Sequence, residues 1–307
     1  MKKHLLITII SGLIAGVTNA QFVVFNNGAE VTVSQGCIVS IVTGDLDNDN
    51  GTIDNAGRIT VDGNLTNSDL LTGASTNTGI FNVSGDWENN AVFTADQSLV
   101  NLNGANQLIT GTQISGFYNL NLLGSGIKSL GLDAQVNGTL QLNNLELATG
   151  VNTLHVLNGA SSAVTENGGF VSSIGAGRLA WSTNSTATYV YPLGSSVGTP
   201  RIRPLALTPA SASPNTFAAR FANVNATTEG YDVLQLSPDL CFVNDQFFHL
   251  IDQTNGSDAA DITQYYVSAD DGDWLKGAHW QGTPEWEDML NESTAAVGGY
   301  NTITNAS

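Results

Sequence analysis

The densest group of potential metal ligands in this chain is the acidic segment DLDNDNGTID. Its carboxylates belong to Asp45, Asp47, Asp49 and Asp54. Carboxylates at alternate positions ahead of a tight turn can wrap a hard cation such as Ca²⁺, which takes about six to eight oxygen ligands. The match to an EF-hand loop is incomplete, because Asn50 stands in place of its sixth-residue glycine and Ala56 in place of its twelfth-residue glutamate. The segment therefore predicts a Ca²⁺ site or, as the incomplete match favours, a solvated corner of turn-forming Asp and Asn.

A second group of interest lies near the C-terminus, where the acidic turn DDGD at 270–273 precedes three tryptophans. These are Trp274, Trp280 and Trp286. Exposed tryptophans stack on sugar rings, so the three residues are candidate glycan contacts. The alternative is that they fill the core of a β-sandwich, which also needs large aromatic side chains. The acidic turn matches no metal-coordination loop, and we expect it to be a solvated hairpin loop.

Catalysis has few candidate residues. The only basic residues between positions 21 and 175 are Arg58, Lys128 and His155. A polysaccharide lyase needs such a base beside acidic metal ligands, and a glycoside hydrolase needs a pair of carboxylates. No adjacent repeats align acidic residues with these bases, and no Gly-x-Ser-x-Gly elbow occurs. We therefore expect no enzymatic activity, and no cofactor beyond the Ca²⁺ considered above.

The elements that would position these residues are short strands in a repeat. Between residues 59 and 160, alternating β-branched residues are followed by a glycine with Asn or Asp close by. The glycines are Gly63, Gly85, Gly104, Gly124, Gly138 and Gly159, at steps of 22, 19, 20, 14 and 21 residues. A period of about 20 residues with one short strand and one turn predicts a solenoid. A right-handed parallel β-helix fits it, since sandwich strands alternate about every 8–12 residues.

The repeat predicts which side chains face inward. We expect one apolar face made of Val61, Val83, Leu102, Leu122, Val136 and Val156. Asn and Asp at the corners would hydrogen-bond backbone groups of neighbouring turns. The stretches 22–25 and 29–33 would cap the first coil. The short step at Gly138 indicates either an irregular coil or a register error.

The sequence composition changes near residue 176, where the repeats stop and after which all seven prolines occur. Proline-bounded strands with longer polar loops predict an antiparallel β-sandwich. Its candidate strands are 178–182, 188–193, 203–208, 216–222, 246–251, 262–268 and 279–281, with a helical turn at 286–292. The predicted organisation is a signal peptide at 1–20, a β-helix domain at 21–175 and a sandwich-like domain at 176–307. The polar end shows no evident closing strand, which suggests that the protein continues past Ser307.

Composition limits the location and partners. Residues 1–20 have the charged start, apolar stretch and small-residue exit of a secretory signal peptide. No segment reaches the roughly 20 apolar residues of a transmembrane helix. Without Lys2 and Lys3, 7 basic residues stand against 27 acidic ones, a formal net charge of −20. This excludes nucleic acid as a partner, because phosphate binding needs basic patches. Export permits a bridge between Cys37 and Cys241, but we expect two small buried hydrophobic residues.

Two parts of the sequence resemble one protein family. The run GTIDNAGRITVDGNLTN at 51–67 is similar to the coils of large secreted surface proteins from gliding Bacteroidota-type bacteria. The segments TYVYPLG at 188–194 and RPL at 203–205 resemble the module that follows such coils. The resemblance implies export by a type IX secretion route, directed by a C-terminal sorting domain, and an adhesin-like role at the cell surface. No sorting domain is present in this sequence.

These observations predict a secreted or cell-surface structural, adhesin-like protein that presents a β-solenoid surface without catalysis. Its partners would be surface glycans or other cell-surface proteins. The alternative is a glycan-binding module or a degenerate lyase-like β-helix. Exposure of the three tryptophans discriminates between the two, because burial in a sandwich core would remove them as glycan contacts.

Overall fold

The computed structural model describes residues 22–73, 79–280 and 285–307. The predicted signal peptide at 1–20 lies outside the described residues. The protein is all-β, with 55% of the described residues in strands and 3% in helices. It divides into two compact units. The first unit ends at residue 169, and the second runs from Phe170 to Ser307 and includes the short segments Thr149–Val151 and Asn158–Val164. This division lies close to the predicted boundary at 175.

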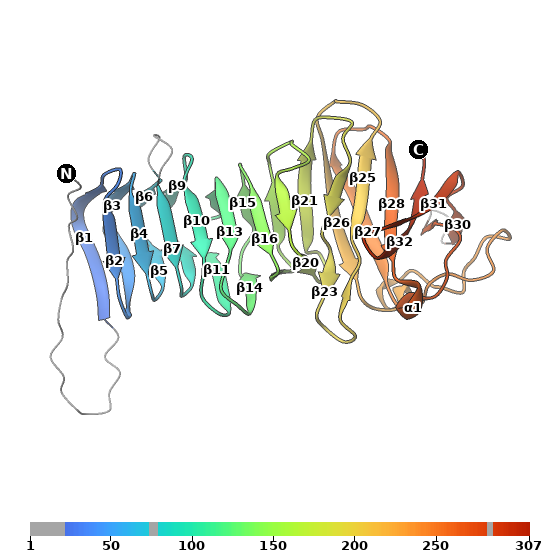
Figure 1. Cartoon of the computed structure of the whole chain (residues 1–307), viewed down its shortest axis with the longest axis horizontal. Coiled ribbons are helices and arrows are strands. Elements are labelled where there is room, and N and C mark those ends of the chain that lie inside the picture. The colour runs from blue at the N-terminus through green and yellow to red at the C-terminus, as the bar shows by residue number, and fades with distance from the viewer. Residues whose placement is uncertain (1–21, 74–78, 281–284) are drawn as a thin grey trace. The chain divides into compact units, whose positions relative to one another are not determined.

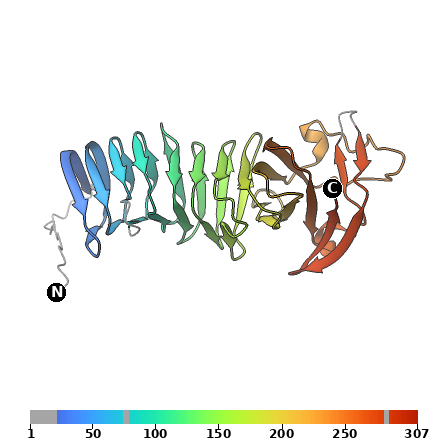
Figure 2. The same ribbon diagram turned by 90° about the horizontal axis from the view of Figure 1, so that it is seen from above.

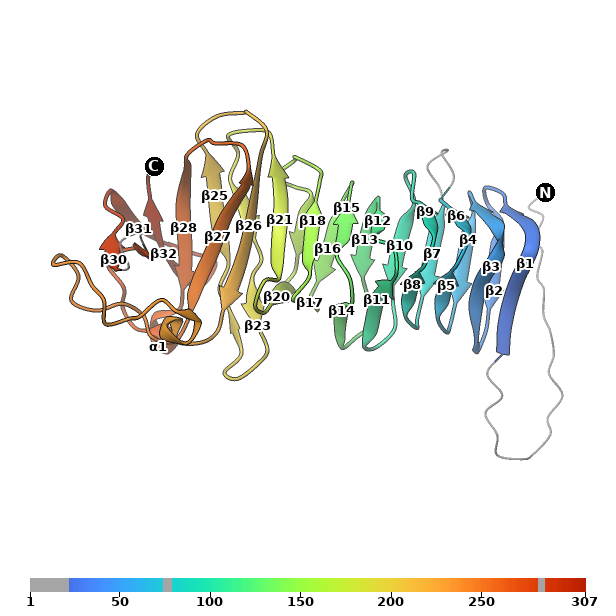
Figure 3. The same ribbon diagram turned by 180° about the vertical axis from the view of Figure 1, so that it is seen from behind.

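The first unit is a parallel β-solenoid of about seven turns, with about 22 residues per coil. Figures 1 and 3 show its strands stacked turn upon turn, and Figure 2 shows the same stack from above. One face consists of β2 (Ile38–Ile41), β4 (Arg58–Val61), β7 (Ile80–Val83), β10 (Leu99–Leu102), β13 (Asn119–Leu122) and β16 (Leu140–Asn143). We call this face the B face. All its neighbouring strands pair in parallel.

Two further rows of strands complete each turn. The second row consists of β1 (Phe22–Val33), β3 (Gly44–Asn55), β5 (Leu65–Asn67), β8 (Trp87–Asn89), β11 (Gln107–Gly111), β14 (Ile127–Leu130) and β17 (Glu146–Gly150). The third row consists of β6 (Leu70–Thr72), β9 (Val92–Thr94), β12 (Ser115–Phe117), β15 (Ala134–Val136) and β18 (Thr153–Val156). The long strand β3 serves both rows, since its first half pairs with β5 and its second half with β6. β19 (Val164–Glu166) follows β18 along the chain.

The predicted apolar ladder exists on the B face, but two of its members belong elsewhere. Val61, Val83, Leu102 and Leu122 pair with one another in sequence order and are fully buried. The other two, on β15 and β18, pair with each other in the third row. The step at Gly138 was a register error, because this glycine lies in the turn between β15 and β16. The repeat was therefore predicted correctly, but Gly138 was assigned to the wrong turn of its coil.

Glycines at the turns let successive coils approach closely. The N–H of Gly63 donates to the Gly44 carbonyl, and that of Gly85 donates to the Gly63 carbonyl, each at 2.8 Å. A Cβ atom at Gly104 would collide with the carbonyl oxygen of Ser84. The spacing of the repeat therefore reflects a steric requirement of the backbone as well as a turn.

The second unit contains two antiparallel sheets, which confirms the sandwich-like prediction. The first contains β21 (Arg178–Thr183), β26 (Asn215–Ala222) and β27 (Phe248–Asn255). The second contains, in spatial order, β22 (Tyr189–Tyr191), β25 (Leu205–Pro209), β28 (Ala260–Tyr266), β32 (Tyr300–Asn305) and β31 (Glu292–Val297). The Tyr191 hydroxyl on one sheet donates to the Phe217 carbonyl on the other at 3.0 Å.

Smaller elements complete this unit. They are β20 (Phe170–Ser173), the pairs β23 (Gly194–Ser195) with β24 (Arg201–Ile202) and β29 (Ala278–Trp280) with β30 (Trp286–Asp288), the 3-10 turn Ala226–Glu229, and α1 (Ser268–Asp271). The predicted helical turn at 286–292 is wrong, since β30 occupies its start. The chain also has a closing strand, β32, that the sequence did not suggest.

The two cysteines are free. Cys37 is half-buried and Cys241 is exposed, so the prediction of two buried hydrophobic residues is wrong.

Candidate functional site

Two columns of asparagine side chains run along the solenoid. We call Asn26, Asn48, Asn67 and Asn89 the corner ladder. Each of the first three donates from Nδ2 to Oδ1 of the next, at 2.8, 3.0 and 2.9 Å. All four are buried, and Asn67 has no exposed surface. The expectation that corner asparagines join neighbouring turns is therefore correct, and their partners include one another.

The second column lies on the B face and is partly accessible to solvent. We call Asn82, Asn101, Asn121 and Asn143 the face ladder. Its donors point the opposite way along the chain, from Asn101 to Asn82, from Asn121 to Asn101 and from Asn143 to Asn121, at 2.8 to 2.9 Å. Neither ladder contains a group that exchanges protons near neutral pH, so neither supplies an acid or a base.

The predicted calcium ligands lie on strand β3, with Asp49 exposed at the corner where β3 passes from the second row to the third. Asp45, Asp47 and Asp49 alternate with Leu46 and Asn48, which face inward. Alternate residues of a strand lie about 6.7 Å apart, so these carboxylates do not converge on one ion. Burial and the neighbouring carboxylates raise the pKa of Asp47 above its ordinary value, with burial as the larger cause.

Two of these carboxylates have structural partners. Asp45 Oδ1 accepts a hydrogen bond from the backbone N–H of Asn64 at 2.7 Å. Asp54 Oδ1 accepts one from the Thr72 hydroxyl at 2.6 Å. Across residues 22–73, 79–280 and 285–307, no group of three or more His, Cys, Asp or Glu side chains is placed to hold a metal ion. The geometry lends the calcium prediction no support.

The three tryptophans do not form one site. Trp286 is 8% exposed and packs in a small apolar cluster with Ala222 and Phe248. Trp280 packs against it edge to face, with ring centroids 5.7 Å apart. Trp274 is half-buried, and its indole Nε1 donates to the Asp271 carbonyl at 2.8 Å. The interpretation as core residues therefore applies to Trp286 and Trp280.

The acidic turn before Trp274 is not the solvated loop that we expected. It begins as α1, and the Asp271 side chain has no exposed surface. Arg203 donates to both of its oxygens, at 2.5 and 2.9 Å, and Arg201 lies 3.4 Å away. Both guanidinium groups lie 5.9 Å from the ring centroid of Phe247. This buried ion pair anchors α1 and the segment after it.

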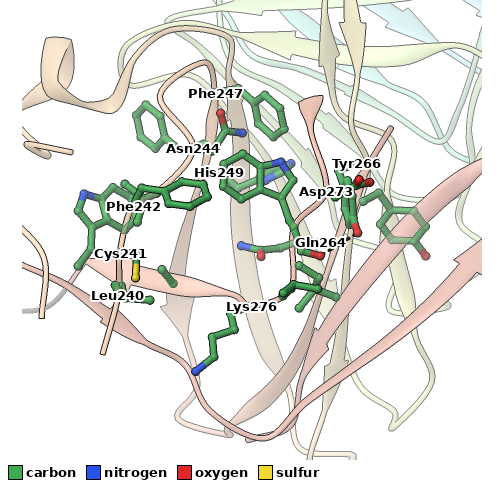
Figure 4. Close-up of a pocket in the computed structure, with 18 of the residues that line it drawn as sticks. Leu240, Cys241, Phe242, Asn244, Phe247, His249, Gln264, Tyr266, Asp273 and Lys276 are labelled. Carbon is green, nitrogen blue, oxygen red and sulfur yellow. Dashed lines mark hydrogen bonds between the residues drawn. The ribbon is translucent and has the colours of Figure 1, made fainter. Parts of the chain in front are cut away.

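That segment forms one wall of a cavity of about 370 Å³ in the second unit (Figure 4). The other walls come from the loop 239–244, the start of β27 and the strands β28 and β32. Aromatic side chains dominate the lining, which includes Phe242, Phe247, Tyr266, Trp274 and Trp286. Trp280 is not part of it. Cavities of about 300–1,000 Å³ that are mostly apolar are typical ligand sites.

Polar groups of the lining come from both sheets and from the loops. His249 Nε2 lies 2.9 Å from the Arg203 carbonyl oxygen. Burial lowers the pKa of His249 to about 4, so the ring is neutral at pH 7 and Nε2–H donates to this carbonyl. Lys276 pairs with Asp288 at the rim. Gln264 on β28 also lines the cavity and makes no side-chain hydrogen bond within the described part of the chain.

No pattern in the sequence predicts most of this cavity. Its residues are separated by up to 64 positions, from Asp239 to Ile303, and no spacing pattern connects them. The one usable signal is the pair of arginines at 201 and 203 in a chain with nine basic residues. Buried arginines need acidic partners, but several carboxylates from Glu229 onward precede Asp271 in the sequence, so its position there does not single it out.

Comparisons with known proteins found no match: no family model, no curated protein and no solved structure is similar to this chain. In the part of the chain that the structure describes, no helix is both long and apolar enough to span a membrane.

Proposed function

We propose that the chain is a secreted, cell-surface-associated structural protein of adhesin-like type that presents its solenoid surface and performs no catalysis. The observation that carries the proposal is a row of neutral polar side chains across the B face. In register from the first turn, the row is Ser40, Thr60, Asn82, Asn101, Asn121 and Gln141. Asn101 is buried and bonded within the face ladder, while the other five side chains are exposed or partly exposed and can hydrogen-bond a partner.

The chemistry of this row favours contact over catalysis. Its hydroxyl and amide groups do not titrate near neutral pH, and none is a strong base or an activated nucleophile. Stacked turns repeat the same groups at the spacing of neighbouring strands, about 4.8 Å. A regular, uncharged and hydrogen-bonding surface suits adhesion to surface glycans or to other cell-surface proteins, which are the partners we propose.

Rigid stacking supports the same role. The corner ladder satisfies buried amides from turn to turn, and apolar side chains fill the interior. The resemblance to secreted surface proteins of gliding Bacteroidota-type bacteria adds a location and an export route, type IX secretion, to the proposal.

The proposal is tested on intact cells of the producing organism. An antiserum against residues 22–307 should label unfixed cells, and external protease should remove the label. Deleting the gene should reduce attachment to a glycan-coated surface, and the full-length gene should restore it. A chain that stays protected from external protease, or a deletion that leaves attachment unchanged, contradicts the proposal.

A further inference from the structure

The cavity of the second unit has features of a ligand site that the proposed role of the solenoid does not require. Its mouth exposes aromatic and apolar side chains, with Phe242 67% exposed and Leu275 80% exposed. The Phe242 and Trp274 rings lie 5.6 Å apart. Soluble proteins rarely expose such side chains side by side outside interaction sites.

One aromatic wall is held rigidly before any ligand arrives. The Trp274 indole donates to the Asp271 carbonyl at 2.8 Å, and the Trp274 carbonyl accepts from the Tyr266 hydroxyl at 2.9 Å. Asp271 is itself fixed by the two hydrogen bonds from Arg203. A preorganised ring loses little conformational entropy on binding, so more of its contact energy appears as affinity.

Hydrogen-bonding groups with unused capacity line the same cavity. The Gln264 amide has no partner in the described chain, so it offers both a donor and an acceptor. Neutral His249 uses Nε2–H on the Arg203 carbonyl, which leaves Nδ1 as an acceptor. Asn244 Oδ1 accepts from the Gln246 backbone N–H at 2.9 Å, and among the described residues its Nδ2 has no acceptor, so it remains a donor.

These groups decide between ligand classes. A purely apolar ligand would strip water from the Gln264 side-chain amide without replacing its hydrogen bonds, which weakens the binding of such a ligand. An anionic ligand would meet the carboxylates of Asp239 and Asp273 in a chain of net charge −18. A sugar ring satisfies both constraints, because it has an apolar face for aromatic rings and hydroxyls for amides and carboxylates.

We propose that this cavity binds a neutral glycan, with one sugar ring against Trp274 and Phe242 and its hydroxyls hydrogen-bonded to Gln264 and His249. The cavity of about 370 Å³ lies at the small end of ligand sites, which suits a terminal residue or a disaccharide. Of the three tryptophans that the sequence singled out, Trp274 has this role. The proposal does not depend on what the B face of the solenoid contacts.

The test uses the full chain on an array of neutral glycans and of sialylated and sulfated ones. Gln264→Leu removes the amide without removing an internal hydrogen bond, so folding should be preserved. The matched control is Gln235→Leu, the same exchange at an exposed residue outside the cavity. We expect binding to neutral glycans, a loss of about tenfold in affinity for Gln264→Leu, and no change for the control.

Cys241 provides an independent readout, since it is exposed and lines the cavity. A glycan found on the array should slow its alkylation, while alkylation of Cys37 in the solenoid unit provides the internal reference. The proposal is overturned if no neutral glycan binds, if only acidic glycans bind, or if Gln264→Leu has no effect. Glycan binding that leaves Cys241 unprotected would assign the ligand to another surface and would also overturn it.

Discussion

Replacing Asn67 by aspartate tests whether the corner ladder stabilises the solenoid through its hydrogen bonds. Asn67 Oδ1 accepts from Asn48, and its Nδ2 donates to Asn89 Oδ1 at 2.9 Å and to the Val92 carbonyl at 3.0 Å. Aspartate has the same shape, so no cavity forms. Its carboxylate still accepts from Asn48, but it cannot donate, and it faces Asn89 Oδ1 and the Val92 carbonyl oxygen.

The expected cost follows from these contacts. One buried acceptor, Asn89 Oδ1, and one part-buried acceptor, the Val92 carbonyl, lose their donor, at about 1–3 kcal/mol each, which gives a loss of about 4 kcal/mol in the free energy of unfolding at pH 7. Desolvation and the facing oxygens raise the pKa of the new carboxyl in the folded state. Protonation then supplies an O–H donor, so Asn67→Asp should regain stability as the pH falls from 7 towards 4.5.

The matched control is Asn82→Asp in the half-exposed face ladder, where water can solvate the new charge. There we expect a loss of about 0–1 kcal/mol. Hydrogen exchange of peptides covering residues 58–94, measured by mass spectrometry at pH 7 and 4.5, reports local opening of these turns. Equal protection in Asn67→Asp and wild type at pH 7, or no recovery at low pH, would refute the hydrogen-bond reasoning.

Three further predictions concern single residues in either unit. Asp271→Ala should destabilise the second unit by about 3–5 kcal/mol in thermal unfolding, because it leaves a buried guanidinium unpaired, whereas Asp270→Ala, at an exposed carboxylate, should change little. The folded-state pKa of His249 lies near 4, below its ordinary 6.5, so the unfolded state binds the proton more tightly. Urea unfolding should therefore show stability that is complete above about pH 6.5 and falls as the pH drops to 4, and a His249→Gln variant with the same dependence would contradict this assignment. Gly104→Ala should cost about 1–3 kcal/mol, because its Cβ would collide with the preceding turn, while Gly116→Ala, whose Cβ would meet one atom at 3.8 Å, should be nearly neutral in the same denaturant titration.

Local patterns were sufficient for much of the fold. The alternation around Val61 and Val83 and the glycine period depend on neighbours within one turn. The solenoid and the inward apolar ladder of the B face were therefore predicted correctly for Val61, Val83, Leu102 and Leu122. The second and third rows of strands were missed because the repeat was interpreted as one strand per unit, and all three rows consist mainly of short strands with the same composition. In the second unit, strands such as 178–182 and 216–222 were found because prolines and polar loops bound them.

The site depended on contacts that the sequence does not encode locally. The acidic segment at 45–54 was interpreted as a loop because of its composition, yet Leu46 and Asn48 alternate with its carboxylates and place it in a strand. The pairing of Asp271 with Arg203 spans 68 residues, and the cavity joins loops and strands that tertiary packing alone brings together. Exposure of the tryptophans likewise depends on packing and could not be inferred from their spacing.

The corner ladder also has consequences for how the solenoid can change in length. Each internal asparagine accepts from the turn before it and donates to the turn after it, so duplicating or removing one whole coil leaves every amide paired. The column also ends without an orphaned group: Asn26 Oδ1 accepts from the Ala29 amide at 3.2 Å, and Asn89 Nδ2 reaches the Ile114 carbonyl at 3.5 Å. Within the turns that the corner ladder spans, one coil can therefore be added or removed without leaving a ladder amide unpaired.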